Sequence, residues 1–311
     1  MEYRTLGKTG IKVSKLAFGG SSLGSVFRSV AEEDGIRTVH TALDHGINLI
    51  DTAPYYGATK AETVLGKALR GVARDRYLLA TKVARFGPDL GDFDFSAARV
   101  ASSIEESLQR LGVNHFDFIQ VHDMEFGNID QIVNETIPAL REARREGKAR
   151  FIGITCLPVR LFKEVMDQVD VDQIQSYCHY GLNDTALAGI LPYLKTKQVG
   201  IFNSAPLAMR LLTQQGAPAW HPASAAVKAK CAEAAAFCEQ QGVDLAKLAL
   251  QFSVAHPDIH TTIVGTANPE RILENIRQIE EPLDQALLSR VLEILKPIHN
   301  VTWPSGRPEN N

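Results

Sequence analysis

The sequence predicts an α/β protein, a (β/α)8 TIM barrel with an N-terminal β-hairpin and a C-terminal helix and tail. Eight short apolar runs recur along the chain, and segments with helical spacing lie between them. The 311 residues suffice for a barrel of about 250 residues with additions. A doubly wound open sheet is the alternative. Against it, no GxGxxG motif follows the first run, and the nearest match, residues 19–24, lacks the spacing and the downstream acid.

The hairpin comes first, because residues 3–6 and 11–13 flank a turn-rich connector. The apolar runs of the barrel follow at residues 16–19, 49–50, 77–80, 116–119, 151–154, 171–174, 199–202 and 261–264. Helical spacing predicts helices at residues 32–45, 96–111, 134–146, 224–241, 243–255 and 269–279. No linker or low-complexity tract interrupts the chain, so residues 1–311 are predicted to form one domain, whose tail at 284–311 folds back over the barrel.

The composition argues against several classes of partner. The net charge of −3 and the pI near 6.3 provide no basic field for nucleic acid or anionic lipid. No run approaches the roughly 18 apolar residues of a membrane span, and the N-terminus has no apolar signal segment, so a cytoplasmic location is expected. The four cysteines form no CxxC pair, which indicates reduced thiols and no zinc site. Nothing in the sequence specifies an oligomeric state.

Titratable residues follow three neighbouring runs of the predicted barrel. Asp51 and Tyr56 come after the second run, Lys82 closes the third, and His122 closes the fourth. Taken singly, each has an ordinary explanation, such as a capping carboxylate, a solvated lysine or a packed histidine. In a parallel barrel, however, consecutive strand ends are neighbours on the catalytic face. The sequence therefore predicts that these four side chains converge on one pocket.

The chemistry of such a group is proton transfer. A free phenol has a pKa near ~10, and a nearby ammonium lowers it. A carboxylate beside the ammonium keeps it charged, and an imidazole can hydrogen-bond a substrate oxygen. This set suits the interconversion of a carbonyl and an alcohol, and it contains no metal-ligand cluster. Because that reaction also needs a hydride carrier, a nicotinamide cofactor is implied.

At these residues the sequence resembles the aldo-keto reductase superfamily. The motifs fall in the family's order at DTAPYYG (51–57), Thr81-Lys82, Val121-His122, residues 151–155 and residues 265–275. The resemblance implies the barrel and a catalytic tetrad of Asp51, Tyr56, Lys82 and His122. It also implies that Tyr56, rather than Tyr55, is the general acid/base.

Further motifs resemble the L-galactose dehydrogenase subfamily. They lie at residues 24–27, 177–181, 204–209, 220–224 and 302–306. This resemblance implies NAD-dependent oxidation of L-galactose, or of a related aldose such as L-fucose or D-arabinose, at C1 to give the galactonolactone. One alternative is an NADPH-dependent reductase of small aldehydes. Another is a cofactor-bound regulatory or scaffolding subunit, against which the complete tetrad argues.

The resemblance also implies where the cofactor binds. The residues carried over are Thr155, Gln175, Ser204, Pro206, Leu207, Gly265, Thr266, Arg271, Glu274 and Asn275. Two places depart from the pattern of many relatives: Thr155-Cys156 replaces a Ser-Asn pair, and Ser204 stands at or near the place of an aromatic residue. The loop before Pro269 is neutral, which favours NAD over NADP because a 2′-phosphate would call for a basic side chain.

The substrate is predicted to be a small sugar held by Tyr56, His122 and residues of the rim loops. His179, Tyr180, Trp220 and His221 follow the sixth and seventh runs and offer polar groups and an apolar platform to a polyol. Ordinary loop packing is the alternative for each of these four residues.

Overall fold

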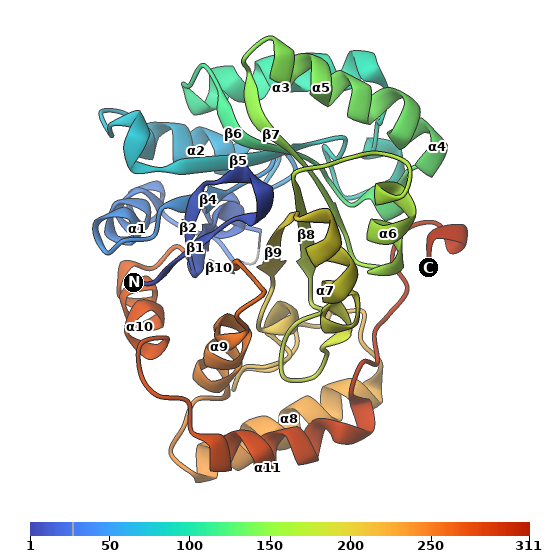
Figure 1. The fold of residues 1–311 in the computed structure, drawn as a ribbon. Helices are drawn as coiled ribbons and strands as arrows, with labels where there is room; N and C mark the ends of the chain where they lie inside the picture. The colour runs from blue at the N-terminus through green and yellow to red at the C-terminus, as the bar shows by residue number, and fades with distance from the viewer. Residues whose placement is uncertain (27) are drawn as a thin grey trace.

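The computed structural model describes residues 1–26 and 28–311. Its centre is a closed barrel of eight parallel strands in chain order, with β10 paired to both β9 and β3 (Figure 1). The strands are β3 (Leu16–Gly19), β4 (Leu49–Asp51), β5 (Leu78–Val83), β6 (Phe116–Val121), β7 (Ala149–Cys156), β8 (Gln173–Tyr177), β9 (Gly200–Ser204) and β10 (Thr261–Gly265). The predicted barrel is confirmed. Phe27, in the motif at 24–27, lies outside the described residues.

The N-terminal hairpin is also confirmed, as antiparallel β1 (Tyr3–Thr5) and β2 (Lys12–Ser14). Leu6, in the turn between them, is fully buried in the barrel interior. It packs against Gly200 at the start of β9, where a Cβ atom would lie 2.5 Å from Leu6 Cγ. The hairpin therefore closes the N-terminal end of the barrel, and only a glycine at position 200 leaves room for that closure.

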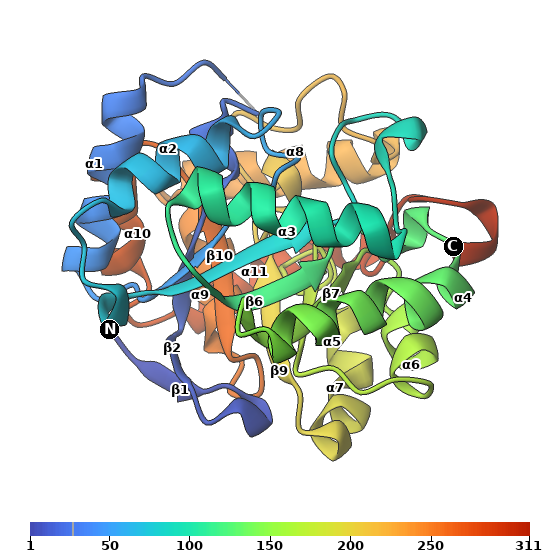
Figure 2. The same ribbon diagram turned by 90° about the horizontal axis from the view of Figure 1, so that it is seen from above.

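Helices surround the barrel (Figures 1 and 2). They are α1 (Glu32–Asp44), α2 (Lys60–Leu69), α3 (Ala97–Leu111), α4 (Ile129–Gln131), α5 (Ile137–Arg145), α6 (Arg160–Met166), α7 (Ala186–Lys197), α9 (Leu245–Ala255) and α10 (Pro269–Gln278). Two more, α8 (Ala225–Gln240) and α11 (Gln285–Leu295), pack on each other as an outer layer. The helix predicted at 134–146 in fact continues one that starts at Ile129, because a π-helical turn at Ile132–Thr136 joins α4 to α5.

Local signals fix several helix ends. The Ser96 hydroxyl accepts a hydrogen bond from the Arg99 amide at the start of α3, as expected for an N-cap. The Asn268 side chain accepts from the Glu270 and Arg271 amides, and Pro269 occupies the first position of α10. Among the described residues, no helix has both the length and the apolar character needed to cross a bilayer. All four cysteines are free and buried.

Alternation along the strands places a polar layer above an apolar one. Side chains two residues apart on a strand face the same side. The buried cluster inside the barrel includes Leu49, Ala80, Phe118 and Phe202. Two residues further along the same strands stand the polar residues Asp51, Lys82, Gln120 and Ser204. The barrel is therefore filled with apolar side chains at its N-terminal end and opens on polar ones at its C-terminal end.

The C-terminal tail returns to the barrel, as predicted, and ends beside α4 and α6 (Figures 1 and 2). The Asn310 amide donates to the Glu125 and Gly127 carbonyl oxygens at 2.8 and 2.9 Å. The Ser305 hydroxyl donates to the Glu125 carboxylate at 3.0 Å. Trp303 is only 8% exposed and faces the cavity described next. The tail thus forms part of the rim at the C-terminal end of the barrel.

Candidate active site

A cavity of about 970 Å³ opens at the carboxyl ends of the strands. All four residues of the predicted tetrad line it: Asp51, Tyr56, Lys82 and His122. Asp51, Lys82 and His122 are nearly closed off from solvent. The Tyr56 ring is partly exposed, since it forms a wall of the cavity. The structure thus brings together side chains that lie up to 71 positions apart, from residue 51 to residue 122.

Lys82 is the centre of the group. Its Nζ atom donates to Asp51 Oδ2 at 2.7 Å and to the Thr52 carbonyl oxygen at 2.9 Å. The same atom lies 3.4 Å from the Tyr56 hydroxyl oxygen. The side chains of Lys82 and Asp51 are 1% and 3% exposed, so the ion pair is buried. A buried ammonium held in this way places a fixed positive charge beside the phenol.

The pKa values of the pair reflect opposing forces. Burial raises the pKa of Tyr56 to about 12, although the Lys82 charge opposes the rise. For Lys82, burial acts to lower the pKa, but the charges of Asp51 and Tyr56 outweigh it, so the net pKa lies above its ordinary value. At neutral pH Lys82 is therefore charged and Tyr56 carries its proton.

The Tyr56 backbone is held by a close approach of two glycines. A Cβ atom at Gly24 would lie 2.5 Å from the Tyr56 carbonyl oxygen. Gly57 has a φ of +64°, and a Cβ atom there would collide with Gly24. The loop after β3 therefore packs directly against the turn that carries Tyr56, which limits how far the phenol can shift.

His122 completes the group from the end of β6. Its ring stands edge-on to the Tyr56 ring, with centroids 5.7 Å apart. Burial, together with the Lys82 and Arg85 charges, lowers the pKa of His122 well below its ordinary value. The imidazole is therefore neutral at physiological pH. A neutral imidazole can donate a hydrogen bond to a substrate oxygen without competing for the proton of Tyr56.

Two glutamines extend the group, and only one of them was predicted. Gln120 Nε2 donates to Asp51 Oδ1 at 3.1 Å. Gln175 Nε2 donates to Ser204 Oγ at 2.8 Å and lies 3.4 Å from Asp51 Oδ2. Gln120 is the one that was not predicted. The signal was its position on β6 two residues before His122, which directly follows the strand, since residues two apart in an extended chain face the same side.

The predicted cofactor residues line the same cavity, except Glu274 and Asn275. Asn275 is buried on α10, whereas Glu274 is exposed and pairs with Arg271. Thr155 Oγ1 already accepts a hydrogen bond from the Asp123 amide at 2.9 Å.

The residues present fit a dinucleotide. The cavity runs from Tyr56 to Arg271 in the first turn of α10, where the positive end of the helix and the Arg271 guanidinium favour an anionic group. Gln175 Oε1 is buried with no donor among the described residues, so it can accept from an amide.

Two of the predicted substrate residues lie away from the cavity. His179 is 3% exposed, and its Nδ1 atom lies 3.1 Å from Asp184 Oδ1. Tyr180 stacks on Phe252 of α9 with ring centroids 5.5 Å apart. Neither residue lines the cavity. The physical reason is that β8 ends at Tyr177 and Cys178 has a φ of +62°, so the chain turns toward the outer helices.

The other two, Trp220 and His221, are adjacent in sequence, but only Trp220 lines the cavity. Trp220 is 57% exposed and lines the cavity. His221 is buried; its Nε2 atom is 3.0 Å from the Ala208 carbonyl oxygen, and its Nδ1 accepts from the Ala223 amide. Because both ring nitrogens are engaged by the backbone, His221 holds the loop together and does not line the cavity.

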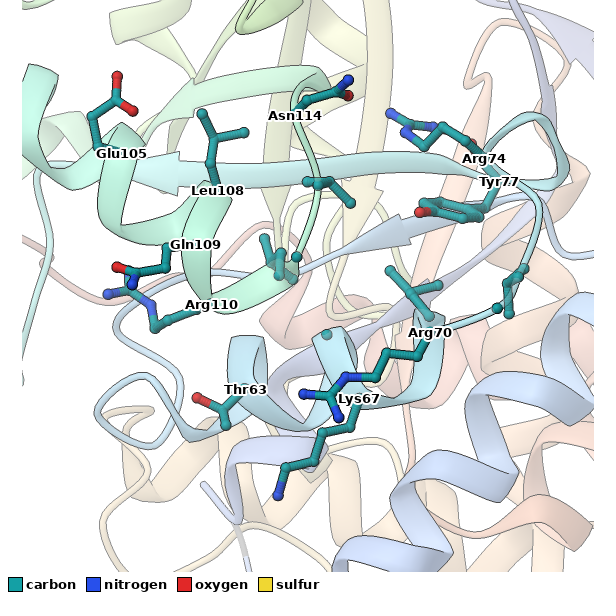
Figure 3. A pocket seen from close by; sticks show the side chains of 17 residues that line it. Thr63, Lys67, Arg70, Arg74, Tyr77, Glu105, Leu108, Gln109, Arg110 and Asn114 are labelled. Atoms are coloured by element: carbon teal, nitrogen blue, oxygen red, sulfur yellow. The ribbon is translucent and has the colours of Figure 1, made fainter.

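A second groove, of about 1030 Å³, lies between the C-terminal ends of α2 and α3 (Figure 3). Its side chains include Lys67, Arg70, Arg74 and Arg110. It adjoins the loops that lead into β5 and β6, at the N-terminal end of the barrel. None of the predicted site residues lines it. Chemistry in parallel barrels takes place at the opposite end, so the cavity above Lys82 is the candidate active site.

The barrel, the Tyr56 phenol and the buried ammonium, carboxylate and imidazole beside it define an oxidoreductase site for a carbonyl/alcohol pair. The comparisons with known proteins agree. A model described as the aldo/keto reductase family matches residues 15–296, and the chain belongs to this family. It is therefore an NAD(P)-dependent oxidoreductase, and a nicotinamide cofactor is implied.

The chain is similar to named relatives over its whole length. It is 50% identical to L-galactose dehydrogenase of Arabidopsis thaliana, covering 100% of this chain and 99% of the relative. It is 30% identical to D-arabinose 1-dehydrogenase of Saccharomyces cerevisiae, covering 95% of each. Among solved structures, the holo form of an aldo-keto reductase from Bacillus halodurans superimposes with a TM-score of 0.79 at 26% identity, over 100% of this chain and 99% of that one.

Proposed function

We propose that this protein is an NAD-dependent aldose dehydrogenase that oxidises L-galactose, or a sugar of related stereochemistry, at C1 to the lactone. The observation that carries the proposal is the contact of Lys82 Nζ with both Asp51 and Tyr56 at the base of the cavity. The choice of a sugar is supported by the 50% identity with an L-galactose dehydrogenase and the 30% identity with a D-arabinose 1-dehydrogenase.

In this proposal Tyr56 takes the proton of the C1 hydroxyl. The positive charge of Lys82 stabilises the phenolate form that accepts it, and Asp51 keeps Lys82 charged and in place. The neutral imidazole of His122 donates to the C1 oxygen and orients it. A bound nicotinamide supplies the hydride acceptor.

The preference for NAD is supported by the surroundings of Arg271. Arg271 Nη1 lies 2.9 Å from Glu274 Oε2 and 4.0 Å from Asp244 Oδ2. Its charge is therefore partly neutralised by protein carboxylates. A 2′-phosphate at this end of the cavity would have to compete with both, and no further basic residue stands in the loop from Gly265 to Pro269.

The test is an assay of NADH absorbance with purified protein. L-galactose is compared with L-fucose, D-arabinose and D-galactose as hydride donors, and NAD with NADP as acceptor. We expect the highest kcat/KM for L-galactose with NAD. The competing activity, NADPH-dependent reduction of small aldehydes, is measured in parallel. A kcat/KM for aldehyde reduction above that for every sugar would overturn the proposal, and a higher kcat/KM with NADP than with NAD would overturn the cofactor assignment.

A further inference from the structure

A second buried carboxylate, Asp123, faces the cavity but has no part in the proton-transfer group. It follows His122 directly, is 4% exposed and lines the cavity together with Arg85 and Tyr55. A carboxylate is seldom buried unless it is paired or has a ligand to bind, because burial strips it of water. Its position one residue beyond His122 places it beside any substrate held there.

The backbone of Asp123 adopts a conformation that suits few side chains. Its φ and ψ are +48° and +59°, in the left-handed region. Its amide donates to Thr155 Oγ1 at 2.9 Å, which fixes this conformation from the neighbouring strand. Residues held in this way recur at functional sites, where the surrounding structure maintains a geometry that the chain alone disfavours.

Arg85 holds the carboxylate from the other side. Its Nη1 atom pairs with Asp123 Oδ2, and its Nε donates to the Gly87 carbonyl oxygen at 3.3 Å. Its guanidinium lies 3.7 Å from the centroid of the Tyr55 ring. The guanidinium is thus fixed in one plane by the aromatic ring and the ion pair.

One acceptor and one donor of this pair are left over. Within the described residues, no hydrogen bond joins Asp123 Oδ1 or Arg85 Nη2 to another group. Both residues line the cavity, so these atoms are available to a ligand. A sugar hydroxyl both donates and accepts a hydrogen bond, and two hydroxyls on adjacent carbons match a carboxylate beside a guanidinium. A simple aldehyde has no hydroxyl that could donate a hydrogen bond to Asp123 Oδ1.

We propose that Asp123, positioned by Arg85, accepts a hydrogen bond from a sugar hydroxyl beyond the reacting carbon and so selects polyhydroxylated substrates. The inference rests on the proposed function. The distance of 3.7 Å between His122 Nε2 and Asp123 Oδ2 supports it, because a sugar whose C1 oxygen meets His122 has its next hydroxyls within reach of the carboxylate.

The experiment combines a substitution of Asp123 with substrates that each lack one hydroxyl. The wild type and Asp123→Asn are assayed with L-galactose and with its 2-, 3-, 4- and 6-deoxy analogues. For L-galactose we expect Asp123→Asn to raise KM at least about 10-fold, with a smaller change in kcat, because a charged acceptor is replaced by a neutral one and the hydrogen bond weakens in the ground state and the transition state alike. We expect the wild type to discriminate against one deoxy analogue by a similar factor, and the variant to lose that discrimination.

Controls separate a local effect from misfolding. Asp130→Asn makes the same chemical change on exposed α4 and is expected to leave KM unaltered. NAD binding, followed by fluorescence titration, reports whether each variant is folded. If Asp123→Asn does not fold, Arg85→Lys replaces it, since it keeps the charge but loses the planar fork; it is expected to weaken the same discrimination.

Each outcome decides something. An unchanged KM in a folded Asp123→Asn, or an equal penalty with all the sugars, overturns this inference and leaves the proposed function standing. Equal wild-type kcat/KM for L-galactose and every deoxy analogue does the same. If the wild type oxidises no aldose, the proposed function fails, and the inference fails with it.

Discussion

Lys82 Nζ lies 2.7 Å from Asp51 Oδ2 inside the barrel, and neither side chain has more than 3% of its surface exposed. Two charges taken out of water depend on each other, since each offsets the desolvation of its partner. The same Lys82 nitrogen is 3.4 Å from the Tyr56 hydroxyl. The ion pair is therefore both a structural element of the barrel and the source of charge beside the phenol, and the two roles can be tested separately.

The structural role predicts a non-additive loss of stability. Lys82→Met leaves the Asp51 charge buried without a counter-ion and should cost about 3–5 kcal/mol in the free energy of unfolding. The double variant Lys82→Met/Asp51→Asn should be more stable than Lys82→Met, because it removes the orphaned charge. Urea denaturation measures both. Lys195→Met, which breaks an exposed pair with Asp258, is the matched control and should cost less than about 1 kcal/mol. Additive losses at positions 51 and 82 would contradict this account.

The catalytic role predicts that Tyr56→Phe loses turnover and keeps its cofactor. Removal of a general acid/base lowers kcat by about 10²- to 10⁴-fold. The ring remains to fill the cavity wall, so the Kd for NAD should change little. Steady-state kinetics and a fluorescence titration provide the two readouts. Tyr193→Phe makes the same change on the surface, where the hydroxyl donates to Asp167, and should keep full activity. A Tyr56→Phe enzyme with more than a tenth of wild-type kcat would exclude this role.

The pKa values predict the pH dependence of sugar oxidation. Burial raises the pKa of Tyr56 to about 12. At pH values well below this pKa, each increase of one pH unit raises the phenolate fraction about tenfold. The kcat/KM for oxidation should therefore rise with pH from 6 to 10. Because burial lowers the pKa of His122 well below its ordinary value, no ionisation of this residue should appear near pH 6.5. The idea is refuted by an inflection near pH 6.5 that disappears in His122→Gln.

The raised pKa of Glu125 predicts that the free energy of unfolding depends on pH. Burial, aided by the Asp123 charge, raises the pKa of Glu125 from 4.5 to about 8. The folded protein then binds a proton that the unfolded chain releases, so this contribution is complete below about pH 4.5 and is lost as the pH rises through about 8. Glu125→Gln removes the ionisation but retains an acceptor for Tyr177 and Ser305.

The measurement for Glu125 is Tm as a function of pH. Between pH 5 and 8, the Tm of the wild type should fall more steeply than that of Glu125→Gln. Glu33→Gln is the control, because that side chain is exposed on α1, and its curve should follow the wild type. Parallel curves for the wild type and Glu125→Gln would show that Glu125 does not ionise over this range.

The carboxylates beside Arg271 predict that removing one of them shifts the cofactor preference toward NADP. Glu274→Gln removes the closer of the two acids and leaves Arg271 freer to meet a 2′-phosphate. We expect kcat/KM with NADP to rise several-fold relative to NAD. Glu293→Gln breaks a comparable i,i+3 pair with Lys296 on α11 and should leave the ratio unchanged. An unchanged ratio in Glu274→Gln would mean that Arg271 does not face the 2′ position.

The sequence by itself determined the barrel and the positions of the tetrad. Apolar runs and helical periodicity are local properties, and a chain with eight apolar runs and helical segments between them has few possible topologies. Parallel strands share one carboxyl edge, so residues such as Asp51 and Lys82 that follow different runs had to meet. The limits of β8 were less well predicted: the strand starts two residues later and ends three residues later than the apolar run at 171–174.

Only the tertiary structure decided which loop side chains face the cavity. Tyr180 and His221 pack against a helix and a loop, whereas Arg85 and Asp123, which were not predicted as site residues, face the cavity. A strand's alternation fixes the direction of its side chains, which is why Gln120 was in principle predictable. A loop has no such period. The directions of its side chains depend on contacts with residues distant in the chain, such as the bond from the Asp123 amide to Thr155.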